Sequence, residues 1–97
     1  MDPRLDDAAI ARALESLPGW ERRGDAITKT FAFPAFLMGI AFVARVAHVA
    51  EEANHHPDMD IRYTSVTCSL STHDSGGITS RDLALARAID HTATERP

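Results

Sequence analysis

The chain has 97 residues, enough for one small domain, and its 44% apolar and 25% charged residues are a globular balance that excludes disorder. The net charge is −4 and the only adjacent basic pair is Arg22-Arg23, so we expect no nucleic-acid partner. A single cysteine, Cys68, cannot form an intrachain disulfide, and no uncharged apolar stretch is long enough to span a membrane. The acidic N-terminus also lacks the apolar region of a signal peptide, so we expect one cytoplasmic domain over residues 1–97.

The N-terminal segment has the pattern of a helix. Asp2-Pro3 is typical of a helix start, with an N-cap residue followed by proline at the first position. Apolar residues then recur at helical spacing at Ile10, Leu14 and Leu17. Pro18-Gly19 ends this predicted helix.

Two strands and a long helix follow. Residues 20–23 and 27–33 read as strands joined by a turn at Gly24-Asp25. The longest helix is predicted from Pro34 to about Asn54, because Pro57 stops it. We expect one face to carry Phe36, Ile40, Val43, Ala47 and Ala50, with Leu37, Phe42, Val46 and Val49 on other faces. A helix that is apolar on several sides needs a second covered face, inside the domain or in a homo-oligomer.

The last third of the chain predicts a second hairpin and a third helix. Residues 59–63 have strand parity, a turn is expected at Thr64-Ser65, and residues 66–70 alternate apolar and polar side chains up to a polar end at His73. The last helix begins at Thr79 and should bury Leu83, Ala86 and Ile89. The order of elements predicts an α+β fold, α-β-β-α-β-β-α, with a four-stranded antiparallel sheet and helices packed on one face.

The segment Glu51 to Pro57 is the most informative for function. Glu51 and His55 are four residues apart and would share a helix face, where the carboxylate and the helix dipole both favour a protonated imidazole. His56 points elsewhere, and Pro57 fixes the exit of the chain. The two histidines either present two proton-transfer groups to one cleft or simply cap the helix.

A metal site is the competing interpretation of the same histidines. Adjacent histidines on a helix diverge by about a hundred degrees. Neither a His-x-x-x-His pair nor a second cysteine is present to complete a ligand set. We therefore expect no metal and no cofactor.

Further polar residues follow in the segment from Ser71 to Asp82. His73 precedes a glycine loop and is either a third imidazole aimed at a cleft or a polar strand end. The spacing of Thr79 and Asp82 resembles a capping box, and Arg81 would by default be a solvated charge. No Gly-x-Ser-x-Gly elbow accompanies the serines, which argues against a nucleophilic serine. The remaining candidates are structural by default: Trp20 in the core or at its rim, and His48 and His91 on helix surfaces.

Together these residues resemble the pterin-4a-carbinolamine dehydratase family. The resemblance covers about residues 5–89 and is carried by Pro18-Gly19-Trp20, by Glu51 with His55-His56-Pro57, and by Ser71-Thr72-His73-Asp74 leading to Gly77, Thr79, Arg81-Asp82 and Ala86. Asp58-Met59-Asp60 departs from it, because some relatives carry an aromatic residue there.

The resemblance implies a 4a-hydroxytetrahydrobiopterin dehydratase, a hydro-lyase that acts by histidine acid-base catalysis. Such enzymes regenerate quinonoid dihydropterin for aromatic amino acid hydroxylases, which would make a hydroxylase a pathway partner. By resemblance, the pocket is lined by catalytic His55, His56 and His73, with Glu51, Asp82, Trp20 and Arg81 binding the pterin. The family also implies a homodimer or homotetramer.

Two other functions stay open. Some relatives bind a transcription factor, so a non-catalytic dimerisation module is the alternative. A pterin-binding chaperone with the same pocket but slow turnover is the other. The physiological pterin, the C4a configuration and the division of acid and base among the histidines also stay open.

Overall fold

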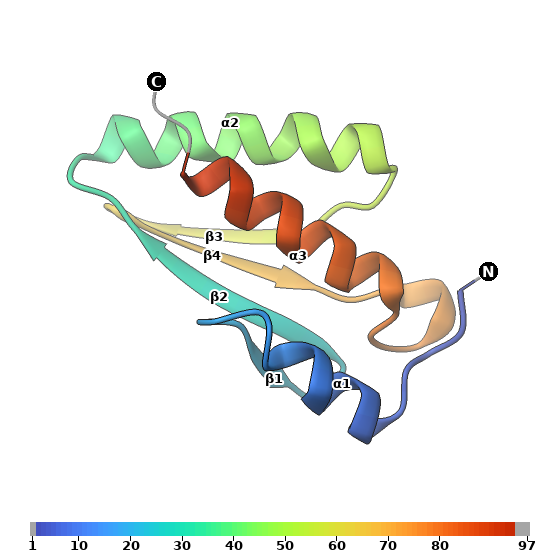
Figure 1. Ribbon diagram of the computed structural model, residues 1–97. Coiled ribbons are helices and arrows are strands. Elements are labelled where there is room, and N and C mark those ends of the chain that lie inside the picture. Colours follow the sequence, from blue (N-terminus) through green and yellow to red (C-terminus); the bar gives the residue numbers. More distant parts are fainter. Residues whose placement is uncertain (1, 95–97) are drawn as a thin grey trace.

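A computed structural model describes residues 2–94 of the chain. Figure 1 shows the elements in order: α1 (Asp7–Leu14), β1 (Glu21–Arg23), β2 (Ala26–Ala32), α2 (Phe36–Ala53), β3 (Asp58–Arg62), β4 (Ser65–Leu70), the short 3-10 turn η1 (His73–Ser75) and α3 (Ser80–Ala93). This is the predicted order. Within the described residues no helix combines the length and apolar character needed to cross a membrane.

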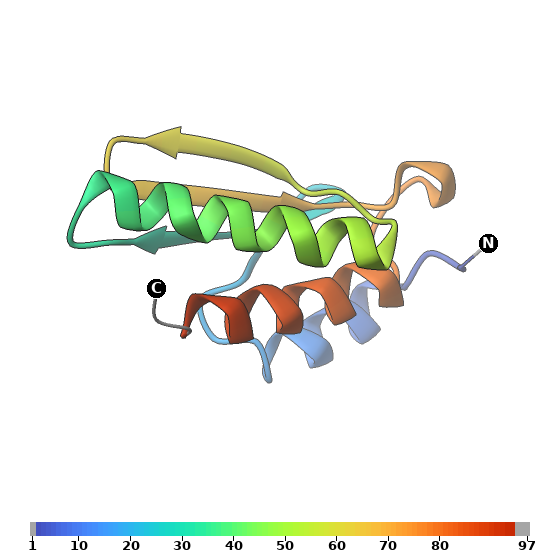
Figure 2. The ribbon, with the colours of Figure 1, turned by 90° about the horizontal axis from the view of Figure 1, so that it is seen from above.

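The strands form one antiparallel sheet in the order β1-β2-β4-β3. The helices lie together on one side of it, as Figure 2 shows. This arrangement confirms the predicted α+β fold. It also makes β3 an edge strand, and it places the polar row of β4 on the face that the helices leave open.

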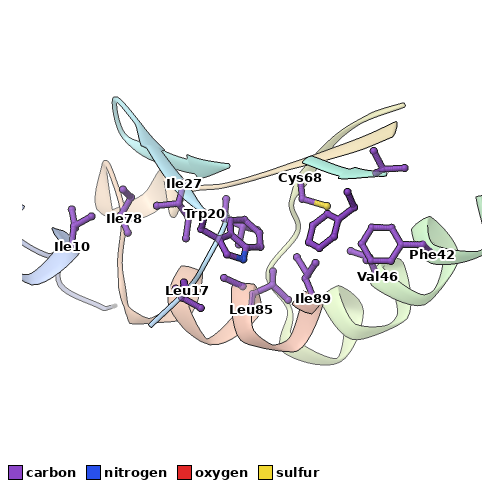
Figure 3. Packing of buried hydrophobic residues seen from close by; sticks show 14 residues of the cluster. Ile10, Leu17, Trp20, Ile27, Phe42, Val46, Cys68, Ile78, Leu85 and Ile89 are labelled. Carbon is purple, nitrogen blue, oxygen red and sulfur yellow. The ribbon is translucent and has the colours of Figure 1, made fainter. Parts of the chain in front are cut away.

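The core lies between the sheet and the helices. Alternate side chains of β4 point into it, and Val66, Cys68 and Leu70 are fully buried, as their spacing predicted. Figure 3 shows Trp20 and Cys68 in the same cluster as side chains from α2 and α3. Near this core Asp90 accepts hydrogen bonds from the Trp20 indole at 3.0 Å and from the Lys29 ammonium at 2.9 Å.

Helix α1 begins four residues later than Asp2-Pro3 indicated. Asp6 is the N-cap, and its side chain accepts a hydrogen bond from the Ala9 N–H at 2.8 Å. The preceding chain stays extended because the Leu5 N–H bonds to the carbonyl of Ile78 at 2.8 Å, which ties it to the loop before α3. A tertiary hydrogen bond therefore overrides the local start signal.

The buried face of α2 also differs from the expected one. It consists of Gly39, Phe42, Val46 and Ala50. Of the five residues expected on one face, only Ala50 is buried, and Phe36 is 44% exposed. Gly39 lies in this row close to Phe33 and Val66, and a Cβ at this position would meet their side chains at ordinary contact distances of 3.4 and 3.6 Å.

The second hairpin turns one residue earlier than expected. Arg62 pairs with Ser65, which leaves Tyr63 and Thr64 as the two turn residues. Tyr63 adopts a left-handed conformation with φ of 50°, so the turn forms without the glycine that such turns prefer. The third helix is close to expectation: Ala86 and Ile89 are buried, whereas Leu83 is half-buried and Leu85 takes the inner position.

Candidate active site

A polar pocket of about 220 Å³ is formed by the end of α2, the segment after β4 and the start of α3. Figure 1 shows these three segments toward the same end of the molecule. It is lined by Asn54, His55, His56, Ser71, Thr72, His73, Asp74 and Arg81. All three histidines predicted to be catalytic therefore border one cavity. A larger pocket, about 390 Å³, is formed around Arg4 and Arg22 and has no histidine in its lining, so we place the chemistry in the smaller one.

The way α2 ends determines where the two adjacent histidines lie. Asn54 adopts a left-handed conformation with φ of 51°, and its N–H bonds to the Glu51 carbonyl at 3.1 Å. The His55 N–H reaches back to the Ala50 carbonyl at 3.1 Å, which completes a Schellman-type helix end. His55 and His56 are therefore outside the helix, and helical spacing does not describe them.

His55 consequently pairs with Asp82. The sequence had predicted Glu51 as its partner, and that prediction was wrong. The Nε2 of His55 lies 2.5 Å from Asp82 Oδ1, across 27 residues of sequence. His55 is only 8% exposed and Asp82 is fully buried. The expected contact with Glu51 is absent because the left-handed Asn54 turns the chain away from the helix face on which Glu51 stands.

Glu51 pairs instead with His56. Its Oε2 forms a short hydrogen bond with His56 Nε2. Both side chains are largely exposed, so solvent screens this pair far more than it screens the pair formed by His55 and Asp82.

The Asp82 carboxylate is held by three protein groups. Oδ1 meets His55, while Oδ2 accepts hydrogen bonds from the Thr72 hydroxyl and the Thr79 N–H, each at 2.9 Å. The last contact belongs to the capping box at the start of α3, which the sequence predicted. One oxygen thus caps the helix and the other fixes the imidazole. Because Oδ1 faces Nε2 of His55, Asp82 is placed to balance a positive charge that forms on the imidazole.

His73 reaches the pocket from another segment. It is exposed and begins η1, whereas the sequence placed it at the end of a strand. The strand stops at Leu70 because Thr72 and Gly77 form an isolated antiparallel bridge, which closes the intervening residues into a loop. His73 therefore stands at the pocket rim on a short turn and not on the sheet.

Arg81 is more than a solvated charge. Its guanidinium Nη2 donates to the Asn54 carbonyl at 2.7 Å and so links the start of α3 to the end of α2. It also borders a second, apolar pocket of about 240 Å³ between these helices, beside His55. Three predicted site residues do not line the polar pocket. Glu51 and Asp82 contact its histidines from outside the lining. Trp20 does not reach it, because it is 4% exposed and its indole is engaged in the core with Asp90.

Sequence reasoning missed four pocket residues: Asn54, Ser71, Thr72 and Asp74. For Thr72 the available signal was its parity, because it continues the inward row of Val66, Cys68 and Leu70 and is buried like them. Within residues 2–94 no three His, Cys, Asp or Glu side chains are grouped so that they could hold a metal ion.

The fold and the site define a class of small α+β proteins with three pocket histidines and a buried aspartate. A family model described as pterin 4 alpha carbinolamine dehydratase matches residues 3–92. The chain belongs to this family.

Relatives and solved structures agree with this assignment. The chain is 56% identical over 91 residues to a protein of Thermomicrobium roseum provisionally named a pterin-4-alpha-carbinolamine dehydratase, with 94% of this chain and 98% of that protein covered. A relative in Nocardia farcinica with the same name is 54% identical over 89 residues, covering 92% and 94%. The crystal structure of a transcriptional coactivator/pterin dehydratase from Brucella melitensis superimposes with a TM-score of 0.89 at 35% identity, covering 93% of this chain and 98% of that one. A pterin dehydratase-like RuBisCO assembly factor of the alpha-carboxysome shares the fold, with a TM-score of 0.64, 24% identity, and 79% of this chain and 89% of that one covered.

Proposed function

We propose that the chain is a hydro-lyase that dehydrates a 4a-hydroxytetrahydropterin to quinonoid dihydropterin by histidine acid-base catalysis. The reaction removes the hydroxyl from C4a and the proton from N5. An acid protonates the departing oxygen, the C4a–O bond breaks, and a base takes the N5 proton as the C4a=N5 bond forms. One water molecule leaves, and no redox change occurs.

The observation that carries this proposal is the grouping of three imidazoles around one polar pocket. Imidazole can donate or accept a proton near pH 7, and each such transfer typically contributes about 10² to 10⁴ in rate. His55 and His73 come from separate segments, so they are suited to reach opposite ends of the reacting C4a–N5 unit. His56, Glu51 and Arg81 would bind and orient the pterin.

Histidine substitutions test the proposal, with dehydration of freshly generated 4a-hydroxytetrahydropterin followed by stopped flow. We expect His55→Ala and His73→Ala each to lower kcat roughly ten- to a thousand-fold, the range for a lost proton transfer. His56→Ala should raise KM more than it lowers kcat. His48→Ala and His91→Ala are matched controls, because both histidines are exposed on helices and border none of the three pockets described here.

The double variant of His55 and His73 sharpens this test. Two groups that act in one step lose less together than the product of their single losses. If both single variants keep near-native kcat with an intact circular dichroism spectrum, the histidines are structural and the proposal is wrong.

The proposed chemistry needs no metal or cofactor, since the leaving hydroxyl is activated by the adjacent N5. Activity should therefore survive long dialysis against a chelator. Loss of activity that zinc or iron restores would contradict the acid-base mechanism.

The proposal places the chain in the cytoplasm, in the recycling of the pterin used by an aromatic amino acid hydroxylase, as a homodimer or homotetramer. A second candidate function is favoured by the Brucella melitensis relative, which is named a transcriptional coactivator as well as a pterin dehydratase. Such a chain would bind a protein partner and not DNA. A chain that binds its partner but lacks dehydration activity would favour this second function.

A further inference from the structure

We infer that Thr72 is a positioning residue, which acts through Asp82 to hold His55 in the tautomer and orientation that its proposed role requires. Only the kinetic test of this inference rests on the proposed function. The structural basis is a buried chain of hydrogen bonds formed by Thr72, which lines the pocket, and by Thr79 and Asp82 behind it. All three residues are at most 3% exposed.

The direction of the hydrogen bonds in this chain can be assigned. The Asp82 carboxylate only accepts, so the single hydroxyl proton of Thr72 goes to Oδ2, at 2.9 Å. The contact of 2.7 Å between the two threonine hydroxyls must then use the proton of Thr79. Thr79 Oγ1 in turn accepts from the Arg81 N–H at 3.2 Å. The chain therefore runs one way, from the first turn of α3 through both hydroxyls to the carboxylate.

The contact of Oδ1 with His55 assigns the tautomer of the imidazole. Oδ2 is occupied by two donors, and Oδ1 lies 2.5 Å from His55 Nε2. An ionised carboxylate at this distance requires a proton on Nε2. Nδ1 is then the ring nitrogen left to exchange a proton with a substrate in the pocket. Hydrogen-bond chains that point one way also strengthen each of their members.

Thr72 is the link in this chain that can be changed with least disturbance of the rest. Thr79 also caps α3, and Asp82 is both the N3 residue of that cap and the partner of His55. Thr72 contributes only its hydroxyl, so Thr72→Val removes the donor while nearly keeping the shape. In the variant the carboxylate retains the Thr79 N–H alone on Oδ2, and it is held less firmly against the imidazole.

Nitrogen-15 NMR of the histidine rings, without substrate, is the first measurement. In the wild-type protein, His55 should show a proton on Nε2 that exchanges slowly with solvent. A wild-type His55 protonated only on Nδ1 would overturn the inference, whether or not any variant folds. In Thr72→Val, we expect Nε2–H to exchange roughly tenfold faster, because a loosened buried network opens more often.

Kinetics and rescue are the second measurement. Thr72→Val should lower kcat roughly tenfold, about the effect of losing one hydrogen bond to a charged group, with KM within about twofold. Thr72→Ser keeps the hydroxyl and should restore both kcat and the slow Nε2–H exchange. Thr67→Val is the matched control, because Thr67 bonds to Thr30 at 2.7 Å on the exposed face of the sheet.

A purely structural Thr72 gives a different result. Thr72→Val would then lower the melting temperature while leaving the His55 signals and kcat unchanged, which would overturn the inference. If the wild-type chain lacks dehydratase activity but the NMR results hold, the proposed function fails and the positioning of His55 by Thr72 stands.

Discussion

His55 Nε2 lies 2.5 Å from Asp82 Oδ1, so a buried hydrogen bond joins the segment that follows α2 to the first turn of α3. The same carboxylate accepts the Thr79 N–H with its other oxygen. The contact to His55 and the capping of α3 therefore depend on one side chain. This sharing predicts that activity and stability are lost together when Asp82 is changed.

Asp82→Asn tests that sharing. The amide keeps the shape of the side chain but not its charge, so Nε2 of His55 loses the anion that stabilises its proton. We expect kcat to fall at least tenfold and the free energy of unfolding to fall by about 1–3 kcal/mol, the usual effect of disturbing a buried hydrogen bond to a charged group. Stopped-flow dehydration and urea denaturation measure the two effects.

Asp90→Asn is the matched control for Asp82→Asn. Asp90 lies on the same helix and is also bonded to two side chains, Trp20 and Lys29, but neither of these partners lines the polar pocket. The Asp90→Asn variant should have a lower free energy of unfolding than the wild type, but the same kcat under conditions in which it is folded. Native kcat in a folded Asp82→Asn variant would contradict a role for this carboxylate in the site.

Glu51→Gln should have a smaller effect than the sequence alone suggests. The helical spacing predicted that Glu51 raises the proton affinity of His55, but Glu51 contacts the exposed His56. We therefore expect Glu51→Gln to resemble His56→Ala, with a raised KM and a kcat reduced by less than about tenfold. A kcat loss as large as that of His55→Ala would show that Glu51 acts on His55 after all. Glu52→Gln, on the neighbouring exposed position of the helix, is the control.

Strand β4 and the partner of His55 show what the sequence could and could not predict. Local periodicity predicts the order of the helices and strands and the inward face of β4. In β4 the apolar residues Val66, Cys68 and Leu70 alternate with polar ones and are buried. The partner of His55 does not follow from local periodicity. It depends on the left-handed conformation of Asn54 and on a residue 27 positions away. Local spacing carries no information about either. The capping box was predictable because both of its members lie within one helical turn.

Cys68 should be unreactive in the folded protein. Burial raises the pKa of its thiol from 9.0 to about 12, and the negative charge of Asp90 adds to the increase. Since the thiolate is the nucleophile, iodoacetamide at pH 8 should label the native chain far more slowly than the chain in urea. Rapid native labelling would contradict the burial seen in the core.

The same pKa predicts how stability changes in alkali. Above pH 9.0 the unfolded thiol loses its proton, whereas the folded thiol keeps it until about pH 12. The folded state then binds more protons than the unfolded state, so stability falls as the pH rises through this window. The slope from this group is at most about 1.4 kcal/mol per pH unit. Cys68→Ala should be less stable at neutral pH because of the cavity, and it should lack this component of the alkaline slope.

The exposed apolar surface predicts self-association. The large hydrophobic side chains that are exposed within residues 2–94 are Phe36, Leu37, Met38, Ile61 and Tyr63, the most exposed of them being Leu37 at 75% and Tyr63 at 78%. They gather at one end of the molecule, where the start of α2 meets the turn between β3 and β4 (Figure 1). The Phe33 N–H bonds to the Thr64 carbonyl at 2.9 Å and joins these two segments. Exposed patches of this kind mark interfaces, and a second copy of the chain is the partner we propose.

Leu37→Asp tests whether this end of the molecule is the interface. A charge placed in an apolar contact costs several kcal/mol at the interface, while Leu37 contributes little to the core of a single chain. We expect sedimentation equilibrium at micromolar concentration to show a dimer or tetramer for the wild type and a smaller species for Leu37→Asp, with unchanged circular dichroism. Ala11→Asp, on the exposed side of α1, introduces the same charge away from the patch and should leave the mass unchanged. A wild-type chain that sediments only as a monomer would refute the homo-oligomer, and an unchanged mass for Leu37→Asp would move the interface to another surface.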